Sequence, residues 1–182
     1  MSAVRCISRR MLLSLLLTPL VPASVAAAPT ASEVKAVYLY NFASFVDWPD
    51  TAFGGSETFE ICVLRDDSLS RALEGVVAGE SVGGRRLVAR RIARALEAAG
   101  CQIVFIGGNE TLGASGVLQA VAGKPVLTVG EVEVFAREGG MIRFVMERGT
   151  VRFQINAAAV SRSGLVMSSK LLQLARVAVA DD

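Results

Sequence analysis

Hydrophobic and polar positions along this chain change their period several times. Patterns that favour β-strands occupy 59–64, 86–92, 102–106 and 125–129. The last two are short apolar runs, whereas apolar and polar residues alternate weakly over 86–92. The segments between and after them predict helices or helical turns at 69–78, 93–99, 111–122 and 131–137. Strands that alternate with helices predict an α/β fold, a single layered domain whose mostly parallel sheet is flanked by helices. Strands this apolar are typical of a sheet buried on both faces.

The clearest local element is a C-terminal antiparallel hairpin over 141–155. With Arg148-Gly149 as its two-residue turn, apolar pairs share one face: Ile142–Ile155, Phe144–Phe153 and Met146–Val151. The other face carries the remaining pairs: Val145–Arg152, Arg143–Gln154 and Glu147–Thr150. A slip of one residue would mix the two faces, so the pattern predicts this register. After it, Asn156 is expected to cap a helix over 157–163. Ser168 or Ser169 is expected to start a last helix, whose apolar side is Leu171, Leu172 and Leu174.

The first helix after residue 30 has an unusual surface. Ser32 is the expected N-cap, the helix runs over 33–47, and Pro49 ends it. Its apolar side chains surround it almost completely, and seven of the chain's eleven aromatic residues fall between Tyr38 and Phe59. A helix that is apolar all round is buried or lies in an interface. Both core packing and a partly exposed aromatic surface for a partner therefore remain open.

Residues 1–27 have the order of a secretory signal peptide. Three arginines come first, an apolar run from Met11 to Val21 follows, and small residues precede a cleavage site after Ala27. The run is short for a membrane span, which needs about 20 residues. An uncleaved anchor is the alternative, and the absence of a cysteine after the small residues argues against a lipoprotein. We expect cleavage, export to the periplasm and a mature domain over 28–182.

Cleavage would change the charge of the protein. The whole chain has 19 basic and 17 acidic residues, and three of the basic ones lie within 1–27. The mature chain would carry a net charge of about −1, so no basic surface for nucleic acid is indicated. Its length of about 155 residues fits one domain, and no linker rich in Pro, Gly or Ser divides it.

Two cysteines, Cys62 and Cys101, remain after cleavage. An even pair in an exported protein favours a disulfide. Closing a loop of about 40 residues would contribute roughly 4 kcal/mol in the chain-entropy model. Buried free thiols and a redox-active pair are the alternatives, although the chain has no Cys-x-x-Cys motif.

The sequence offers little for catalysis. It contains no histidine, which removes Ser-His-Asp and Cys-His systems and the usual zinc or non-haem iron ligand sets. We therefore expect no catalytic residues, no metal site and no cofactor, and we expect that the protein is not an enzyme. Ser168-Ser169-Lys170 lacks the spacing of a Ser-x-x-Lys dyad and fits a helix N-cap better.

Three further clusters have a structural and a functional interpretation. Gly107-Gly108 after a strand fits a tight turn or a phosphate-binding loop. Asp66-Asp67 fits a helix cap or part of an acid/base or Ca²⁺ site. The basic stretch over 85–91 fits a solvated strand edge or an anion site. The polar Asn41 and Asn156, in apolar surroundings, are expected to satisfy backbone groups.

Several motifs resemble the YfiR family, in order and over essentially the whole mature chain. The opening motif is KAVYLYNFASFVDWP at 35–49. Further matches are ICVL at 61–64, GCQIVFI at 100–106, PVLTV at 125–129, GGMI at 139–142, VRFQIN at 151–156 and GLVMSSKLL at 164–172.

The resemblance implies an α/β periplasmic regulator that forms dimers. The best-known member represses an inner-membrane diguanylate cyclase by binding its periplasmic sensor domain, and an outer-membrane lipoprotein can draw that repressor away. Cys62 and Cys101 match the positions of a family disulfide. A second bridge of that member, near the hairpin, has no counterpart here. Other relatives are expected to serve other receptors, such as sensor kinases.

The leading hypothesis is a non-enzymatic regulator in cyclic di-GMP signalling that holds off an inner-membrane protein, a diguanylate cyclase or a sensor kinase. Its partner-binding candidates are the polar hairpin face and the aromatic first helix: Arg143, Val145, Arg152, Gln154, Tyr38, Phe42, Phe45 and Trp48. The alternative is a small-molecule binding protein that feeds a sensor kinase. It would bind an anion or nucleotide between the 85–91 stretch and Gly107-Gly108.

Overall fold

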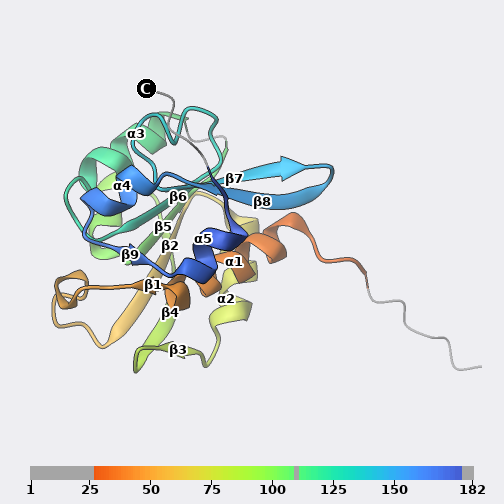
Figure 1. Ribbon diagram of the computed structural model, residues 1–182. Helices are drawn as coiled ribbons and strands as arrows, with labels where there is room; N and C mark the ends of the chain where they lie inside the picture. The colour runs from red at the N-terminus through yellow and green to blue at the C-terminus, as the bar shows by residue number, and fades with distance from the viewer. Residues whose placement is uncertain (1–26, 109–110, 178–182) are drawn as a thin grey trace, which may run out of the picture.

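A computed structural model describes residues 27–108 and 111–177. Its main sheet has eight strands in the order β10-β8-β7-β6-β5-β2-β4-β3 (Figure 1). The strands are β2 Thr58–Leu64, β3 Ser81–Val82, β4 Arg85–Ile92, β5 Ile103–Ile106, β6 Leu127–Gly130, β7 Ile142–Glu147, β8 Thr150–Ile155 and β10 Arg176–Val177. Within this sheet only β3–β4 and β7–β8 pair antiparallel, which confirms the α/β fold with a mostly parallel sheet.

Helices cover both faces of this sheet. They are α1 Ala31–Phe45, α2 Asp67–Val77, α3 Thr111–Ala120, α4 Ala157–Arg162 and α5 Ser169–Leu174, with 3-10 turns η1 Asp50–Ala52 and η2 Ala95–Gly100. A second sheet contains β1 Val46–Asp47 and β9 Val166–Met167. None of the described helices is long and apolar enough to cross a membrane. Residues 1–26, which hold nearly all of the expected signal peptide, lie outside the described residues.

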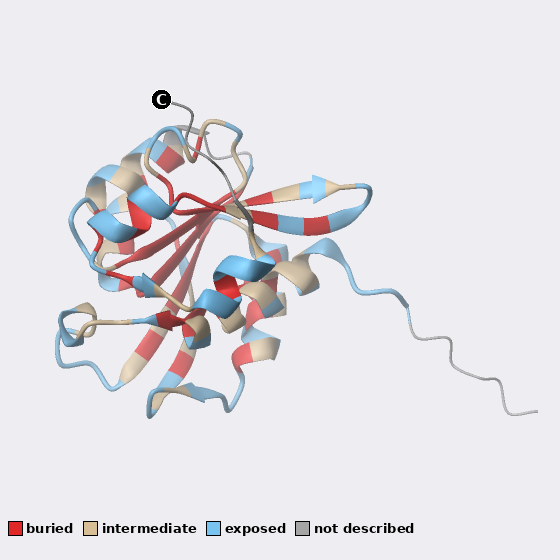
Figure 2. Cartoon of the chain, viewed as in Figure 1, coloured by how far each residue is buried: buried red, intermediate tan, exposed pale blue. Residues whose placement is uncertain are grey.

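Alternate residues of the central strands point to two separate cores. Phe59, Ile61 and Val63 of β2 belong to the core under α1 and α2, whereas Cys62 and Leu64 belong to the core under η2 and α3. Figure 2 shows the central strands buried along their length between these layers. This double burial explains why the strands read as continuous apolar runs.

The first helix begins earlier than Ser32. Thr30 is its N-cap, and it forms a capping box with Glu33 in which each side chain binds the other residue's backbone N–H. The helix also ends earlier, at Phe45, because Val46 and Asp47 pair with Met167 and Val166 as β1. The expected end at Pro49 was therefore wrong.

The hairpin has the predicted register, from Ile142 opposite Ile155 to Glu147 opposite Thr150. Arg148 and Gly149 have φ angles of 49° and 78°, as a type I′ turn requires. The apolar face is not buried to its end, because Met146 keeps 58% of its surface exposed. Figure 1 shows why: the hairpin extends past the other strands of the sheet.

Two expected helices differ from the structure. Residues 133–139 form turns instead of a helix, and the wholly buried Phe135 ring lies against Gly130 and Gly140, where an added Cβ would collide with it. In α5 only Leu171 is buried, while Leu172 and Leu174 are exposed. The caps expected at Asn156 and Ser168 are confirmed.

Candidate functional site

A crevice lies where the strand order reverses. The chain passes from β2 to β4 on one side and then returns to β5 on the other side of β2. In open α/β sheets, ligands bind at the carboxyl ends of the strands at such a point. Here a pocket of about 350 Å³ is lined mainly by polar groups: Arg65, Asp66, Asp67, Ser68, Gly107, Gly108 and Glu131.

The acidic groups of this crevice have structural partners. Asp66 is the N-cap of α2 and accepts from the Leu69 N–H at 2.9 Å, so the helix-cap interpretation is confirmed. Glu131 accepts from the Gly108 N–H at 3.3 Å and forms an ion pair with Lys35. The excess of carboxylates makes the crevice a poor place for an anion.

The basic stretch does not converge on Gly107-Gly108. Thr58 pairs with Arg86, whereas Leu64 pairs with Ile106. Arg86 therefore lies six residues along the sheet from the end of β5, or roughly 20 Å. Arg91, at the nearer end of β4, pairs with Asp67 and Glu74. The anion site expected between these two segments is not formed.

The polar hairpin candidates lie together on one face of a projecting element. Arg152 is exposed, and Arg143, Val145 and Gln154 are partly exposed. The Nε of Arg143 is buried and has no hydrogen-bond partner in the described chain. Beside it, a pocket of about 370 Å³ is lined by Lys35, Glu131, Arg143, Phe144, Val145, Met146 and Val151.

The aromatic candidates on the first helix belong mainly to the core. Phe42 is wholly buried and is therefore inaccessible to a partner. Tyr38 packs against the rings of Phe42, Phe144 and Phe153. Phe45 and Trp48 are partly buried: Lys170 lies over the Phe45 ring, and Trp48 donates to the Ala43 carbonyl at 3.2 Å. The structure therefore favours core packing over an exposed aromatic surface.

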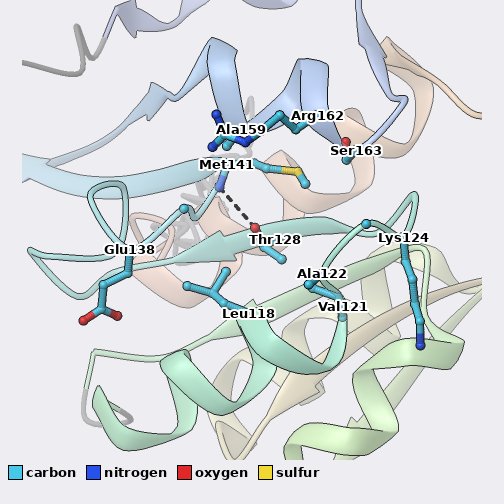
Figure 3. A pocket seen from close by; sticks show the side chains of 12 residues that line it. Leu118, Val121, Ala122, Lys124, Thr128, Glu138, Met141, Ala159, Arg162 and Ser163 are labelled. Atoms are coloured by element: carbon cyan, nitrogen blue, oxygen red, sulfur yellow. Dashed lines mark hydrogen bonds between the residues drawn. The ribbon is translucent and has the colours of Figure 1, made fainter. Parts of the chain in front are cut away.

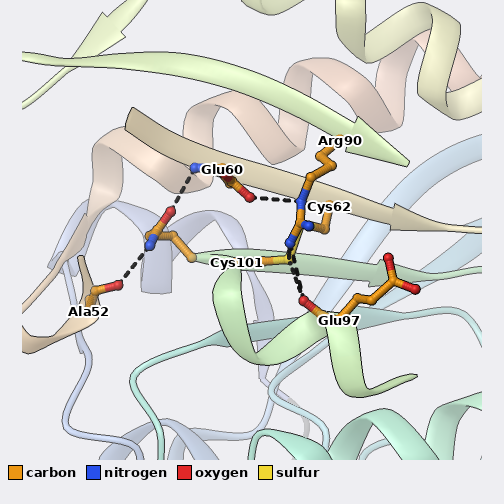
Figure 4. The surroundings of a disulfide bond; sticks show 7 residues. Ala52, Glu60, Cys62, Arg90, Glu97 and Cys101 are labelled. Atoms are coloured by element: carbon orange, nitrogen blue, oxygen red, sulfur yellow. Dashed lines mark hydrogen bonds and ion pairs between the residues drawn. A yellow bond between two sulfur atoms is a disulfide. The ribbon is translucent and has the colours of Figure 1, made fainter. Parts of the chain in front are cut away.

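Cys62 and Cys101 form a disulfide, as expected (Figure 4). It is buried and joins β2 to the residue two positions before β5. Arg90 lies over it, with Nη2 3.4 Å from the Cys101 sulfur and Nε 2.8 Å from the Glu60 carboxylate. Among the described residues, the only cluster of three or more His, Cys, Asp or Glu side chains close enough to share a metal ion is Glu60, Cys62 and Cys101. Its two sulfurs are bonded to each other.

Gln102 is a buried residue whose role the sequence analysis missed. Its side chain accepts from the Glu60 N–H at 2.6 Å and donates to the Ala52 carbonyl at 2.7 Å (Figure 4). It therefore ties the η1 loop to β2 and β5. A polar residue directly before an apolar strand was the available signal, because such a residue is buried only when it is hydrogen bonded.

The largest of these pockets lies between α3 and α4 (Figure 3). It measures about 480 Å³, and its apolar floor includes Leu118, Val121 and Met141. Lys124 and Arg162 flank it. The Thr128 hydroxyl accepts from the Met141 N–H at 3.1 Å and is thereby already engaged.

Besides the carboxyl in the cap of α1, two side chains, Tyr40 and Glu97, have shifted pKa values, and each shift has a simple local cause. Donation from Tyr40 to the Glu80 carboxylate raises the pKa of the tyrosine. A hydrogen bond from Arg94 lowers the pKa of Glu97. Neither pair adjoins a nucleophile, so these shifts do not indicate an acid/base centre.

The chain matches a known protein family. A sequence profile described as YfiR/HmsC-like (DUF4154) matches residues 32–176, which is most of the chain. The matched region begins within α1 and ends in β10, so it covers both cores and the hairpin.

Proposed function

Because this chain belongs to the YfiR/HmsC-like family, we propose that it is a periplasmic regulator of cyclic di-GMP signalling that works by binding and not by catalysis. Its partner is the periplasmic domain of an inner-membrane signalling protein, a diguanylate cyclase in the first place, which it represses. A sensor kinase is the second class of partner, and an outer-membrane lipoprotein is a third component that would relieve repression. The protein acts as a homodimer.

The observation that carries this proposal is the projecting hairpin. It presents Arg143, Val145, Arg152 and Gln154 on one face. Arg143 and Gln154 lie at its base, opposite Gly130 of β6 and Arg176 of β10, and the hairpin projects from there past the other strands (Figure 1). The register of the hairpin holds these side chains in place, because the buried partners on the opposite face anchor the base of both strands. Polar and cationic groups on a rigid projection suit recognition of another protein, since arginine is enriched in such interfaces.

The test is the cyclic di-GMP level of cells that lack the gene. We expect deletion to raise it and the wild-type gene to restore it. The double variant Arg152→Glu/Gln154→Glu should fail to restore it, whereas Arg71→Glu on the exposed side of α2 should succeed. A deletion strain with unchanged cyclic di-GMP, in the presence of an active cyclase, would refute the cyclase version of the proposal.

The pocket between α3 and α4 favours a second candidate function, binding of a small anion or nucleotide that a sensor kinase reads. Its volume of about 480 Å³ is in the range of ligand pockets, and Lys124 and Arg162 supply positive charge. A ligand at 100 times its Kd should stabilise the protein by about 2.7 kcal/mol. A thermal-shift screen with nucleotides measures this, and Arg162→Glu should abolish the shift.

A further inference from the structure

The edge of β7 is only partly covered within the sheet. On one side β8 pairs with it along its whole length. On the other side β6 pairs only with Ile142 and Arg143, because β6 ends at Gly130. Strand β7 continues past this point, and none of the described strands pairs with it further on that side. The pocket lined by Lys35, Glu131 and Arg143 lies in the place that a longer β6 would occupy; we call it the β7 slot.

The backbone next to this slot has hydrogen-bonding groups that point outward. In an antiparallel pair closed by a two-residue turn, the pair that flanks the turn is hydrogen bonded and the pairs then alternate. Glu147 and Thr150 flank the turn. The backbone N–H and C=O of Met146 therefore point away from β8. Such an edge is a template for an additional strand.

The charged side chains at the slot are not all paired with one another. Lys35 and Glu131 pair with each other, with only 14% and 22% of their side chains exposed. Arg143 takes part in none of the ion pairs found in the described part of the chain, and its Nε is shielded from water without a hydrogen-bond partner. A shielded donor of this kind needs an acceptor. The slot thus carries one positive charge for which the described residues provide no ion-pair partner.

We infer that the β7 slot receives an extended segment of the regulated protein, which adds as a strand beside β7 and places an Asp or Glu carboxylate on Arg143. The outward backbone groups select an extended peptide over a small anion, and the unneutralised guanidinium selects an acidic side chain. The inference rests on the proposed function for the identity of the partner and goes beyond it in naming the mode of contact.

The test is photo-crosslinking of the full chain in its own cells. A photoreactive phenylalanine derivative replaces Val145, which lines the slot, and the cross-linked peptide is mapped by mass spectrometry. We expect an adduct with a periplasmic segment of a membrane protein that contains Asp or Glu within two residues of the link. An adduct with a second copy of this chain, or no adduct, overturns the inference.

Two pairs of variants separate the backbone contribution from the charge contribution. Met146→Pro removes the outward N–H and should lower the adduct yield at least about tenfold, whereas Met146→Ala keeps the N–H and should lower the yield much less. Arg143→Glu should lower the yield similarly, while Arg86→Glu, which makes the same charge change at an exposed position of β4, should not. Equal yields within either pair overturn the inference. Circular dichroism confirms that each variant folds.

Two further readouts complete the test. Calorimetry of the purified protein with inorganic phosphate tests whether the slot binds a free anion instead of a peptide. Binding with a Kd below about 1 mM that Arg143→Glu abolishes would mean that the slot takes small anions, and it would overturn the inference that a peptide binds there. Cyclic di-GMP separates this inference from the proposed function. A rise on deletion without the adduct refutes the slot alone, and the adduct without a rise refutes the cyclase version alone.

Discussion

The two faces of the sheet carry cores of very different size. Under α1 and α2, twenty-six buried residues form one cluster in the described chain, and five of them are phenylalanines. Under η2 and α3 the cluster has twelve buried residues, with Phe135 as its one aromatic. The smaller core contains the disulfide and adjoins the buried Gln102. Where apolar burial is small, a covalent bridge and specific hydrogen bonds replace it.

Removal of the disulfide should have the largest effect and should fall on the smaller core. Its cysteines are 39 positions apart, so Cys62→Ala/Cys101→Ala should cost about 4 kcal/mol of unfolding free energy. Hydrogen exchange should show lost protection first in η2 and α3 and retained protection in α1. Chemical denaturation gives the total, and reduction of the wild type by dithiothreitol is the matched control. Equal loss of protection on both faces would contradict the division into two cores.

Truncation of Phe42 should weaken the larger core. The ring is wholly buried and contacts Tyr38, Phe144 and Phe153. Phe42→Ala should cost about 3 kcal/mol, near the low end of the usual range, because the half-buried Tyr38 ring can move into the space. Denaturant unfolding measures the loss, and hydrogen exchange should now locate it at α1 and the hairpin base. A loss below about 1 kcal/mol would mean that this core does not depend on its aromatic cluster.

Gln102→Leu tests the hydrogen bonds that supplement the smaller core. The substitution leaves the Glu60 N–H and the Ala52 carbonyl without their side-chain partner. We expect a cost of about 2 kcal/mol and increased exchange of the Glu60 amide. Gln119→Leu, on the exposed side of α3, is the control and should change stability by less than about 0.5 kcal/mol. Equal effects of the two variants would show that Gln102 is not needed.

The smallest effect is expected at the exposed start of α1, beside the larger core. The Thr30 backbone N–H and hydroxyl donate to Glu33 and hold the pKa of this carboxyl below its usual 4.5. A lowered folded pKa stabilises the fold above pH 4.5, and this contribution is lost as the pH falls through the folded value. Wild type should therefore exceed Glu33→Gln in stability at neutral pH and match it in acid. Glu57→Gln, in an exposed loop, is the matched substitution for this comparison.

The hairpin and the turns at 133–139 show how far local patterns reach. The hairpin register followed from one two-residue turn and three apolar pairs, which are all local in sequence. Apolar spacing suggested a helix at 131–137, but the ring of Phe135 lies between Gly130 and Gly140. A contact that brings both glycines onto one ring is not visible in the spacing of apolar residues.

The predicted partner-binding residues also divide into those that local sequence pattern placed correctly and those that tertiary packing decided. Alternation along the hairpin placed Arg143, Val145, Arg152 and Gln154 on one face, as the structure has them. The aromatic helix had two open interpretations, and burial of Phe42 decided between them. Expected convergence of the 85–91 stretch on Gly107-Gly108 was wrong, since strand register separates them along the sheet.

The sequence by itself determined the longer strands, most of the helices, the hairpin register and the family, because each depends on residues close in sequence or on a motif. It did not predict the short strands β1, β3, β9 and β10, and it favoured a Cys62–Cys101 bridge only because these two cysteines remain after the expected cleavage. Tertiary structure alone decided which face of each strand meets which layer, how far β6 extends beside β7, and which cations have partners. These features depend on where non-neighbouring segments end relative to one another in space. The β7 slot exists only because one strand stops before its neighbour does.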